Sequence, residues 1–542
     1  MSKNYFTFET INSSIFGVLA KKGNADVFLG AGDGEIEIER IEKRNEDNLL
    51  LSVRVRNASS KCIKIFSFIV ADFCLPQEYF PKKILEHGWL QCSEVSYKTL
   101  DSTTEQNTVF LKRDQNPFSF KEEYGYLKNS IISEWFTHLV FSKKSLFVGA
   151  VTTADQFTQI FIKKEETAVR VRVTCQYDGL TVGSGQSVYS EKILFSLGEE
   201  DVVKSNFAKS LAKNMKVKKP KDPIKAMCCS YYWNGNKISE EIINNELDAI
   251  KSLSERLDID FIQLDAGYTK YFGDWLDYKE RFPGGFEGII KRIKNMGYRP
   301  GIWLSPFAIS PATKLHDYHK SWFIRDEDSE HFEGRMTSPF DNMSDFINLE
   351  VLDPTKEEVQ EYLKKVLTHF KNLGFELFKV DFVYPVCLNN NYFKPVTRAQ
   401  ALRRGMELVR ETLGEDTLIL SCISQLSPLV GLVDFVRTGI DTLNPFVDEI
   451  PFLDSGINNF MLERNIKESE LRLFLNGIVW TADPDVLVFR DGTGISTELI
   501  EKHKRFALEN NMSLWIGDSI AKMKEENRKK LVKFFGSNRI KR

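Results

Sequence analysis

Apolar and polar positions follow two different rhythms along the chain. Up to about Ser196, short runs with period-two alternation are separated by turn residues. Examples are GEIEIERI (34–41), LLLSVRVR (49–56) and AVRVRVTCQY (168–177). Alternation of this kind, rich in β-branched and aromatic residues, is typical of antiparallel strands that bury one face. So many of them in succession predict an all-β sandwich.

After Lys225 the rhythm changes to short apolar runs that alternate with amphipathic helical stretches. We expect eight strands at 226–232, 260–268, 298–307, 376–385, 416–424, 434–441, 477–482 and 513–517. Strands that alternate with helices form parallel sheets, and eight such units within about 290 residues are typical of a closed (β/α)₈ barrel. The fold class expected is therefore multidomain, all-β followed by an α/β TIM barrel.

The same pattern sets the expected domain boundaries. We predict a β-sandwich over 1–198, a helical linker over 199–225, the barrel over 226–520 and a short C-terminal remnant over 521–542. The linker contains the lysine- and proline-rich stretch KNMKVKKPKDPIK (213–225), which favours a solvated segment rather than a nucleic-acid patch.

Charge and cysteine usage exclude several classes of partner. The net charge is −3, so no strong field recruits nucleic acid or an acidic membrane surface. The eight cysteines form no CxxC pair, and no Cys/His spacing indicates zinc. The first residues lack the apolar core of a secretion signal, and no apolar run approaches the length of a membrane span. We therefore expect a cytoplasmic protein with neither a membrane nor a nucleic-acid partner.

Acidic residues mark the expected carboxyl ends of several barrel strands, where TIM barrels place their reactive groups. Asp265 ends strand two, Asp381 strand four and Asp441 strand six, and Asp483 and Asp485 follow strand seven. Lys379 precedes Asp381 by two residues, which places both on one strand face and predicts a lowered pKa for Asp381. Two carboxylates across the mouth, Asp381 and Asp441, are what glycoside hydrolysis requires.

Simpler structural interpretations remain open for these residues. Asp381 and Asp441 could cap the helices that follow them, and Asp265 could shape a turn. Trp303 could belong to the core, and Lys379 could serve only as an ion-pair partner.

At these motifs the chain resembles the α-galactosidases of glycoside hydrolase family 36. The matching segments follow one another in order over about 230 residues: FIQLDAGY (261–268), GDW (273–275), GYRPGIWLSPF (297–307), FKVDF (378–382), VRTGID (436–441) and ADPDVL (482–487). In the N-terminal half, GWLQC (88–92) resembles a family loop that reaches the sugar. The resemblance implies an N-terminal β-supersandwich, the catalytic barrel and a small C-terminal β domain, for which this chain is short.

The resemblance also implies roles for single residues. Asp381 falls on the family's nucleophile and Asp441 on its acid/base, and the mechanism implied is retention by double displacement with no metal or cofactor. The positions that fall on the sugar-holding residues are Asp265, Trp303, Lys379, Arg437, Tyr231 and Trp89. The chain departs from the family at Ala266, where a second acid is usual, at Tyr231 and Cys92, where tryptophans are usual, and at CISQ (422–425).

These observations lead to one expected function and two alternatives. We expect an α-glycosidase that acts on terminal α-linked galactose or a related sugar of an oligosaccharide or glycoside. A transglycosylase resembling raffinose synthases uses the same two acids, and a sugar-binding protein on a catalytically silent barrel is the other alternative. The sequence leaves open whether the chain forms a homo-oligomer.

Overall fold

The computed structural model describes residues 8, 11, 14–22, 25–30, 34–102, 130–142, 144–228, 230–324, 349–443 and 456–536. They form two compact units. Unit 1 comprises Met1–Lys218, Cys387–Arg403 and Gln425–Gly431, and unit 2 comprises Lys219–Val386, Arg404–Ser424 and Leu432–Arg542.

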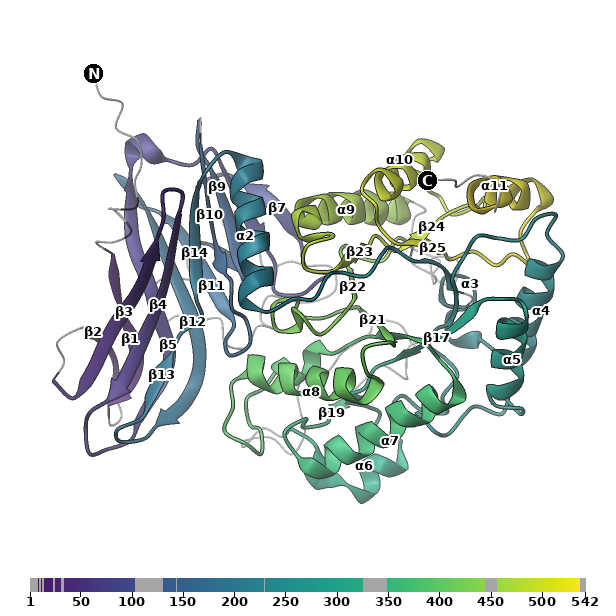
Figure 1. Ribbon diagram of the computed structural model, residues 1–542, viewed down its shortest axis with the longest axis horizontal. Coiled ribbons are helices and arrows are strands. Elements are labelled where there is room, and N and C mark those ends of the chain that lie inside the picture. The colour runs from purple at the N-terminus through teal and green to yellow at the C-terminus, as the bar shows by residue number, and fades with distance from the viewer. Residues whose placement is uncertain are drawn as a thin grey trace. The chain divides into compact units, whose positions relative to one another are not determined.

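Unit 1 is an antiparallel sandwich of two sheets (Figure 1). The six-stranded sheet has the order β2 (Ala25–Gly30), β1 (Ile15–Lys22), β5 (Ile63–Pro76), β12 (Ala168–Val182), β11 (Thr158–Lys164) and β8 (Ser130–Glu134). The eight-stranded sheet has the order β13 (Ser187–Tyr189), β4 (Asn48–Asn57), β14 (Ile193–Gly198), β10 (Ser145–Ala150), β9 (Phe136–Val140), β6 (Lys83–His87) and β7 (Val95–Lys98), with β3 (Ile36–Arg44) also on β4. The sandwich predicted for the N-terminal part is thus confirmed.

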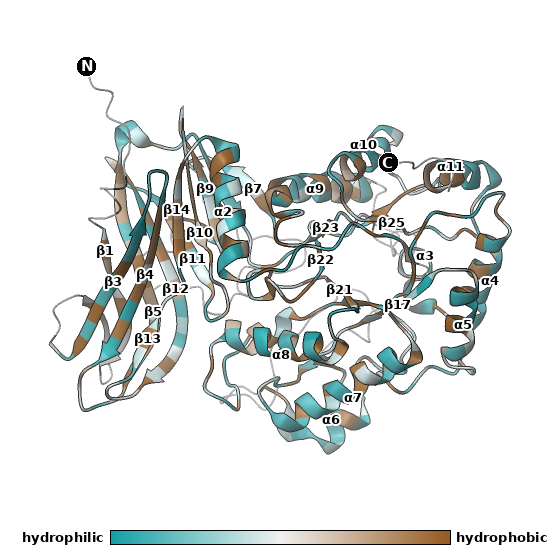
Figure 2. Ribbon diagram, in the orientation of Figure 1, coloured by the Kyte–Doolittle hydropathy of each residue, from teal (hydrophilic) through white to brown (hydrophobic). Residues whose placement is uncertain are grey.

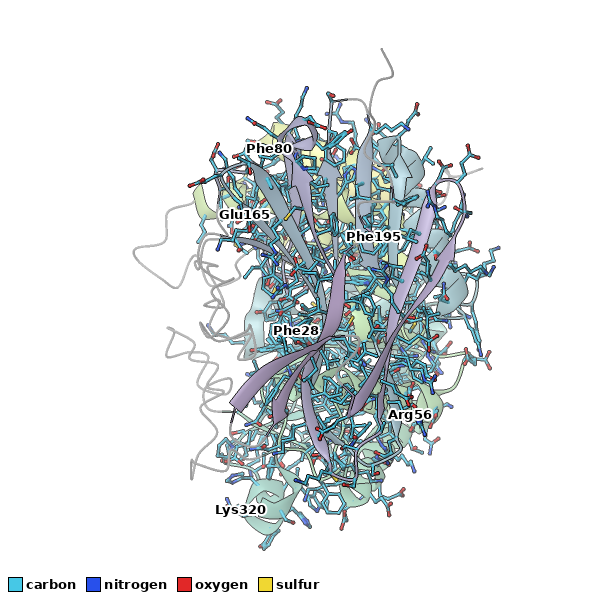
Figure 3. The ribbon with its side chains drawn as sticks, turned by 90° about the vertical axis from the view of Figure 1, so that its left-hand side faces the viewer. Phe28, Arg56, Phe80, Glu165, Phe195 and Lys320 are labelled. Carbon is cyan, nitrogen blue, oxygen red and sulfur yellow. The ribbon has the colours of Figure 1, made fainter. Side chains whose placement is uncertain are left out.

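The alternation along β4 shows why these residues form strands. Leu49, Leu51, Val53 and Val55 are at most 1% exposed, so one face of the strand is covered by the sandwich interior. Figure 3, in which the strands of unit 1 face the viewer, labels Phe195 of β14, which is fully buried, and Phe28 of β2, which is 45% exposed. Apolar burial of this kind supplies most of the stabilisation of a sheet.

Helix α2 (Glu200–Asn214) packs against β10 and β14 of unit 1. Its Phe207 ring lies 4.7 Å from that of Phe147 and 5.6 Å from that of Phe136. The first half of the segment predicted as a linker therefore contributes apolar side chains to the core of the sandwich.

Unit 2 contains a parallel sheet of nine strands that curls into a barrel (Figure 1). The order is β23 (Thr481–Asp483), β22 (Phe435–Arg437), β21 (Leu418–Ser421), β20 (Leu377–Val380), β17 (Arg299–Leu304), β16 (Phe261–Leu264), β15 (Lys225–Cys228), β25 (Leu514–Ile516) and β24 (Val486–Leu487). Only Pro484 and Asp485 separate β23 from β24, so these two segments are the halves of one interrupted seventh strand. The seventh strand pairs with β22 on one side and β25 on the other, which closes an eight-stranded ring.

Among the described residues, α-helices follow every barrel strand except β21. They are α4 (Glu240–Lys251), α5 (Glu287–Asn295), α7 (Glu357–Leu373), α8 (Arg398–Leu413), α9 (Gly456–Arg472), α10 (Thr497–Glu509) and α11 (Glu525–Phe535). Figure 2 shows the strands as largely hydrophobic and the helices as two-faced. Ser239 and Ser496 cap α4 and α10, and Gly374 ends α7 in the left-handed conformation, as the sequence pattern predicts for helix ends. No helix among the described residues is long and apolar enough to cross a membrane.

The eight predicted strands all occur, but several are shorter than expected. Strand one was expected over 226–232 and ends at Cys228, because Tyr231–Asn234 turns into the short helix α3. Short elements also follow the third strand, namely β18 (Ala308–Ile309), α6 (Lys314–Tyr318) and β19 (Glu350–Val351). The domain boundaries proposed from the sequence stay predictions; α11, within the predicted C-terminal remnant, lies in unit 2, and residues 537–542 lie outside the described residues.

The segment Cys387–Arg403, which follows β20 in the chain, is tied into unit 1 by a buried ion pair. Arg398 is fully buried and donates from Nε and Nη2 to Oδ1 of Asp178 at 3.2 and 3.1 Å. It also donates to the side-chain oxygen of Gln176. The side-chain amide of Gln176 donates to Oε1 of Gln159 at 2.7 Å, and that of Gln159 donates to Oε1 of Glu134 at 2.6 Å. The Arg398–Asp178 pair therefore stands at the end of a buried chain of hydrogen bonds.

We expect Arg398→Met to destabilise unit 1 by about 3–5 kcal/mol, because it leaves the Asp178 carboxylate buried without its cation. The exposed pair Arg54–Glu39 provides the control, since Arg54→Met removes an ion pair worth about 0.2–1 kcal/mol. Urea unfolding followed by far-UV circular dichroism measures both. Equal midpoints for the two variants would show that the buried pair is dispensable.

Candidate active site

The carboxyl ends of the barrel strands gather a cluster of charged and aromatic side chains. Asp265 directly follows β16, Asp381 follows β20 and Cys422 follows β21. Arg437 ends β22 with Asp441 four residues later, and Asp483 and Asp485 lie on either side of Pro484 in the seventh strand. All of these residues belong to unit 2.

Asp381 is a buried carboxylate held by two N–H donors. The indole Nε1 of Trp303 donates to its Oδ2 at 3.0 Å, and the backbone N–H of Phe382 donates to its Oδ1 at 2.8 Å. Burial raises the pKa of Asp381, and the charge of Lys379 and these hydrogen bonds oppose the rise without cancelling it. The prediction of a lowered Asp381 pKa is therefore wrong, because desolvation at this depth outweighs the neighbouring cation.

Lys379 lies on the same buried strand but pairs with a different acid. Its Nζ donates to Oδ2 of Asp265 at 2.9 Å, with both side chains at most 7% exposed. Gln263 donates to the same oxygen at 3.1 Å, and the backbone N–H of Ala266 donates to Oδ1 at 2.9 Å. Burial alone would raise the pKa of Asp265, but the lysine charge and these donors outweigh it and lower the pKa overall.

Arg437 is shared by three carboxyl groups. Its Nε pairs with Asp483 at 3.0 Å, its Nη2 with Asp485 at 2.8 Å and its Nη1 with Asp441 at 3.1 Å. The guanidinium is 4% exposed, and the side chains of Asp483 and Asp485 are fully buried. Burial alone would lower the pKa of Arg437, but the surrounding carboxylates raise it well above its usual value.

Asp441 differs from the other acids because its side chain is 37% exposed. Its Oδ1 lies 3.1 Å from the hydroxyl of Tyr232 as well as from Arg437. Desolvation by the surrounding protein and the charge of Asp485 raise the pKa of Asp441 to about 6, and Asp381 adds to the rise. Asp381 and Asp441 both follow strands at the same end of the barrel, where their like charges oppose each other.

Three residues beside this cluster adopt positive φ angles that non-glycine residues rarely use. They are Phe382 (48°), Ile423 (35°) and Asp485 (72°), and each follows the end of a barrel strand segment by one or two residues. Such conformations cost of order 1–3 kcal/mol each and concentrate at functional sites.

The sequence assigns a catalytic or sugar-binding role to eight residues. The structure brings seven of them together, namely Asp265, Trp303, Lys379, Asp381, Arg437, Asp441 and Tyr231. Tyr231 belongs with them, since the charges of Asp441, Asp265 and Asp381 all act on its phenol. Trp303 is 3% exposed and packs against Phe272 and Trp275, so it is both a core residue and a hydrogen-bond donor to Asp381.

The eighth residue, Trp89, lies in unit 1. Together with Trp135, Phe157 and Gln425 it lines a cavity that is large enough for about one water molecule. The indole Nε1 of Trp89 and both side-chain polar atoms of Gln425 are buried there without a hydrogen-bond partner among the described residues.

Sequence reasoning missed Tyr232 and the contacts of Asp485. Tyr232 escaped notice because the predicted first strand extended through it, and on a strand Tyr231 and Tyr232 would point to opposite faces. The helical turn that replaces this part of the strand lets Tyr232 reach Asp441 while Tyr231 stays near the acids. Asp485 was noted in the sequence as the second acid of ADPD (482–485), but nothing in the pattern indicated which side chains it would contact.

Comparison with known proteins gives consistent matches. The sequence model of the Melibiase family matches residues 240–383, a range that includes Asp381 and excludes Asp441. The α-galactosidase AgaA of Geobacillus stearothermophilus is 26% identical over 145 residues, which is 26% of this chain and 17% of AgaA. An α-galactosidase of Escherichia coli is 29% identical over 91 residues, 15% of this chain and 13% of that protein. The matched segments thus span less than a fifth of these curated relatives.

Solved structures match over a larger part of the chain. TtGalA, the α-galactosidase of Thermus thermophilus in complex with stachyose, aligns over 92% of this chain and 99% of its own at 20% identity, with a TM-score of 0.67. The family 36 structure of AgaA aligns over 92% of this chain and 67% of its own at 14% identity, with a TM-score of 0.61. The chain is similar to α-galactosidases in part of its sequence, and to family 36 α-galactosidase structures in its fold. The family resemblance read from the motifs is therefore confirmed, and the family's sandwich-plus-barrel arrangement agrees with the fold described above.

The raised pKa of Asp441 predicts a pH-dependent stability difference. An acid whose pKa rises on folding is disfavoured in its ionised form, so wild-type protein loses stability as the pH rises from about 4 to about 7. We expect Asp441→Asn, which mimics the neutral acid, to have a higher melting temperature than wild type at pH 7.5, and this advantage to vanish near pH 4. Differential scanning fluorimetry across this range measures it.

The exposed carboxyl of Asp416, in the loop before β21, provides the control. The difference in melting temperature between Asp416→Asn and wild type should stay the same across this pH range. If Asp441→Asn were no more stable than wild type at pH 7.5, the raised pKa would be contradicted.

Proposed function

We propose that the chain is a retaining α-glycosidase that hydrolyses terminal α-linked galactose or a related sugar by double displacement. Asp381 is the nucleophile and Asp441 the general acid/base. The names of the relatives and the stachyose and aryl galactoside complexes of TtGalA support a sugar substrate. The transglycosylase and the non-catalytic sugar-binding protein are not favoured.

The observation that carries the proposal is the contrast between the two acids. Asp381 is buried and accepts one hydrogen bond at each carboxylate oxygen, and these bonds fix the orientation of the carboxylate. Asp441 is partly exposed and has a pKa of about 6, so it can release and regain a proton near neutral pH. Two carboxyls in such different surroundings match the two roles that glycoside hydrolysis requires.

The reaction then proceeds in two steps. In the first, an oxygen of Asp381 attacks the anomeric carbon while Asp441 gives its proton to the departing glycosidic oxygen, and a glycosyl ester forms on Asp381. In the second, Asp441 takes a proton from water, whose oxygen attacks the same carbon and releases Asp381. Each displacement inverts the anomeric carbon, so the product retains the configuration of the substrate.

The remaining residues of the cluster would orient the sugar. Asp265, Lys379, Arg437, Tyr231 and Trp303 are the proposed contacts in the barrel, and Trp89 of unit 1 is a further one that the resemblance alone supports. Ala266 leaves a methyl group where the family has an acid that recognises the galactose C4/C6 side. Loss of one such hydrogen bond to a charged group changes affinity by about 1.5–3 kcal/mol, so the proposed glycone includes modified galactose and other related sugars as well as galactose itself. We place this activity in the cytoplasm.

Kinetics with a panel of 4-nitrophenyl α-glycosides test the proposal. We expect hydrolysis of the α-galactoside or of a related α-glycoside, with the α-anomer of the free sugar appearing first in proton NMR spectra. Asp381→Ala should lower kcat by at least about 10³-fold, since nucleophile removal disables both steps. A first product in the β-configuration would overturn the retaining mechanism, and full activity of Asp381→Ala would overturn the site.

Azide separates the two acids in the same assay. With Asp441→Ala, we expect azide to accelerate turnover of an activated aryl glycoside and to give the α-glycosyl azide, because it attacks the intermediate on Asp381. With Asp381→Ala, any azide product should be the β-anomer. Addition of a sugar acceptor to wild type tests transfer, and a transfer product in place of free sugar would favour the transglycosylase.

The hydrogen bond from Trp303 to Asp381 yields a further prediction. Trp303→Phe keeps an aromatic ring but removes the donor, and loss of a charge-assisted hydrogen bond should lower kcat/KM roughly 10- to 100-fold. Trp275→Phe is the matched control, since Trp275 lies in the same aromatic cluster and its Nε1 has no hydrogen-bond partner among the described residues. Equal losses in both variants would attribute the effect to packing.

A further inference from the structure

The hydroxyl group of Tyr232 lies between two carboxyl groups. Its oxygen is 2.6 Å from Oδ2 of Asp485 and 3.1 Å from Oδ1 of Asp441. A phenol has one proton to donate. The shorter distance assigns that proton to Asp485, so Asp441 receives at most a weak share of it.

The guanidinium of Arg437 also lies between these two carboxyl groups. Its Nη2 lies 2.8 Å from Asp485 and its Nη1 lies 3.1 Å from Asp441, while Asp483 occupies Nε. The two acids thus share the Tyr232 hydroxyl and pair with different nitrogens of the Arg437 guanidinium, with Asp485 the closer of the two at each group.

Asp485 is held where it can do this by the break in the seventh strand. Its φ of 72° departs from the strand conformation, its backbone N–H donates to Asp483 at 2.8 Å and its Oδ2 accepts from the backbone N–H of Thr442 at 2.7 Å. Thr442 is the residue after Asp441, so the same carboxylate also anchors the backbone that carries the acid/base. Breaks of this kind in strands next to active sites serve to redirect a side chain.

We propose that Asp485 is a positioning residue for Asp441: it takes the Tyr232 proton, shares the charge of Arg437 and places its own negative charge beside the Asp441 carboxyl, and so keeps Asp441 protonated for catalysis. The inference rests on the proposed role of Asp441 as acid/base. It gives the interrupted seventh strand a function, because a continuous strand would not place this carboxylate beside Tyr232.

Several titratable groups face Asp441 from the neighbouring strand ends. They are Tyr231 and Tyr232 of α3, Lys379 and Asp381 at the end of β20, Cys422 at the end of β21, Arg437 of β22 and Asp485 in the seventh strand. The charges of Asp485 and Asp381 act against ionisation of Asp441, and the charges of Arg437 and Lys379 favour it. Neutralising Asp485 removes the larger opposing charge and frees two donors, and both changes favour the Asp441 carboxylate.

Asp485→Asn therefore shifts the pH profile in a defined direction. The basic limb of kcat/KM reports the acid that must be protonated in the free enzyme. We expect this limb to move to lower pH by about one unit or more, the usual effect of removing a neighbouring like charge. Activity at pH 7 should fall more than activity at pH 5, and Asp485→Glu, which keeps the charge, should restore much of the wild-type profile.

Asp518→Asn is the matched control. Asp518 is an equally buried carboxyl at the barrel rim, paired with Arg490 at 3.0 Å, and its other hydrogen bonds come from the backbone N–H groups of Phe489 and Arg490. Its loss should reduce stability without moving the basic limb. A reduced kcat with an unmoved limb in Asp485→Asn, as in this control, would show that Asp485 is only structural.

Tyr232→Phe is the second arm and stays informative if Asp485→Asn does not fold. If the tyrosine proton belongs to Asp485, removal of the hydroxyl should move the basic limb by less than about half a unit. A shift of the basic limb to higher pH by about one unit or more in Tyr232→Phe would mean that Tyr232 donates its proton to Asp441, which overturns the proposal.

A titration separates this inference from the proposed function. Carbon-13 NMR of protein labelled at aspartate carboxyl carbons, with Asp441 assigned by its loss in Asp441→Asn, measures the Asp441 pKa without substrate. A wild-type protein inactive on all glycosides would defeat the proposed function, whereas an unchanged Asp441 pKa in Asp485→Asn would defeat the inference alone.

Discussion

Two buried cations face five carboxyl groups at the carboxyl end of the barrel, and this imbalance governs the chemistry of the site. Lys379 neutralises Asp265, and Arg437 is divided among Asp441, Asp483 and Asp485. Asp381 accepts hydrogen bonds from two N–H donors and is further stabilised by the nearby charge of Lys379. Desolvation and the charge of Asp485 raise the pKa of Asp441 to about 6, and its 37% exposed side chain leaves it accessible for proton exchange. In the proposed reaction, the surplus of negative charge would favour the cationic transition state of glycoside cleavage.

The same imbalance connects the site to the way the barrel closes. The ring is completed by a strand that stops after Asp483 and resumes at Val486, and Asp485 in the break contacts Arg437, Tyr232 and the backbone of Thr442. Closure of the barrel and the arrangement of charges therefore depend on the same two residues between the half-strands. A continuous seventh strand would make a better sheet and a different electrostatic environment for Asp441.

The architecture and the positions of the catalytic candidates were predictable from the sequence, because strand alternation, helix ends and acids after strands are local signals. The pairing within the site was not. Lys379 lies two residues from Asp381 and yet binds Asp265, which comes 114 residues earlier, since the partner of a side chain inside a barrel is set by the neighbouring strands. Tyr232 was missed for a local reason, because a helical turn replaced the end of a strand. Its place between Asp441 and Asp485 depends on strands one, six and seven together.

The departures from local rules give evidence about the site that does not depend on any relative. Phe382, Ile423 and Asp485 adopt strained backbone conformations, Asp441 has a raised pKa, and several carboxyls are buried in excess of their cations. Each feature costs stability, and the barrel offsets them with apolar layers that include Phe261, Leu377, Leu420 and Phe435. Three of the seven described non-glycine residues with positive φ lie at the ends of strands four, five and seven, beside the acids, as expected where chemistry is placed at one end of a barrel.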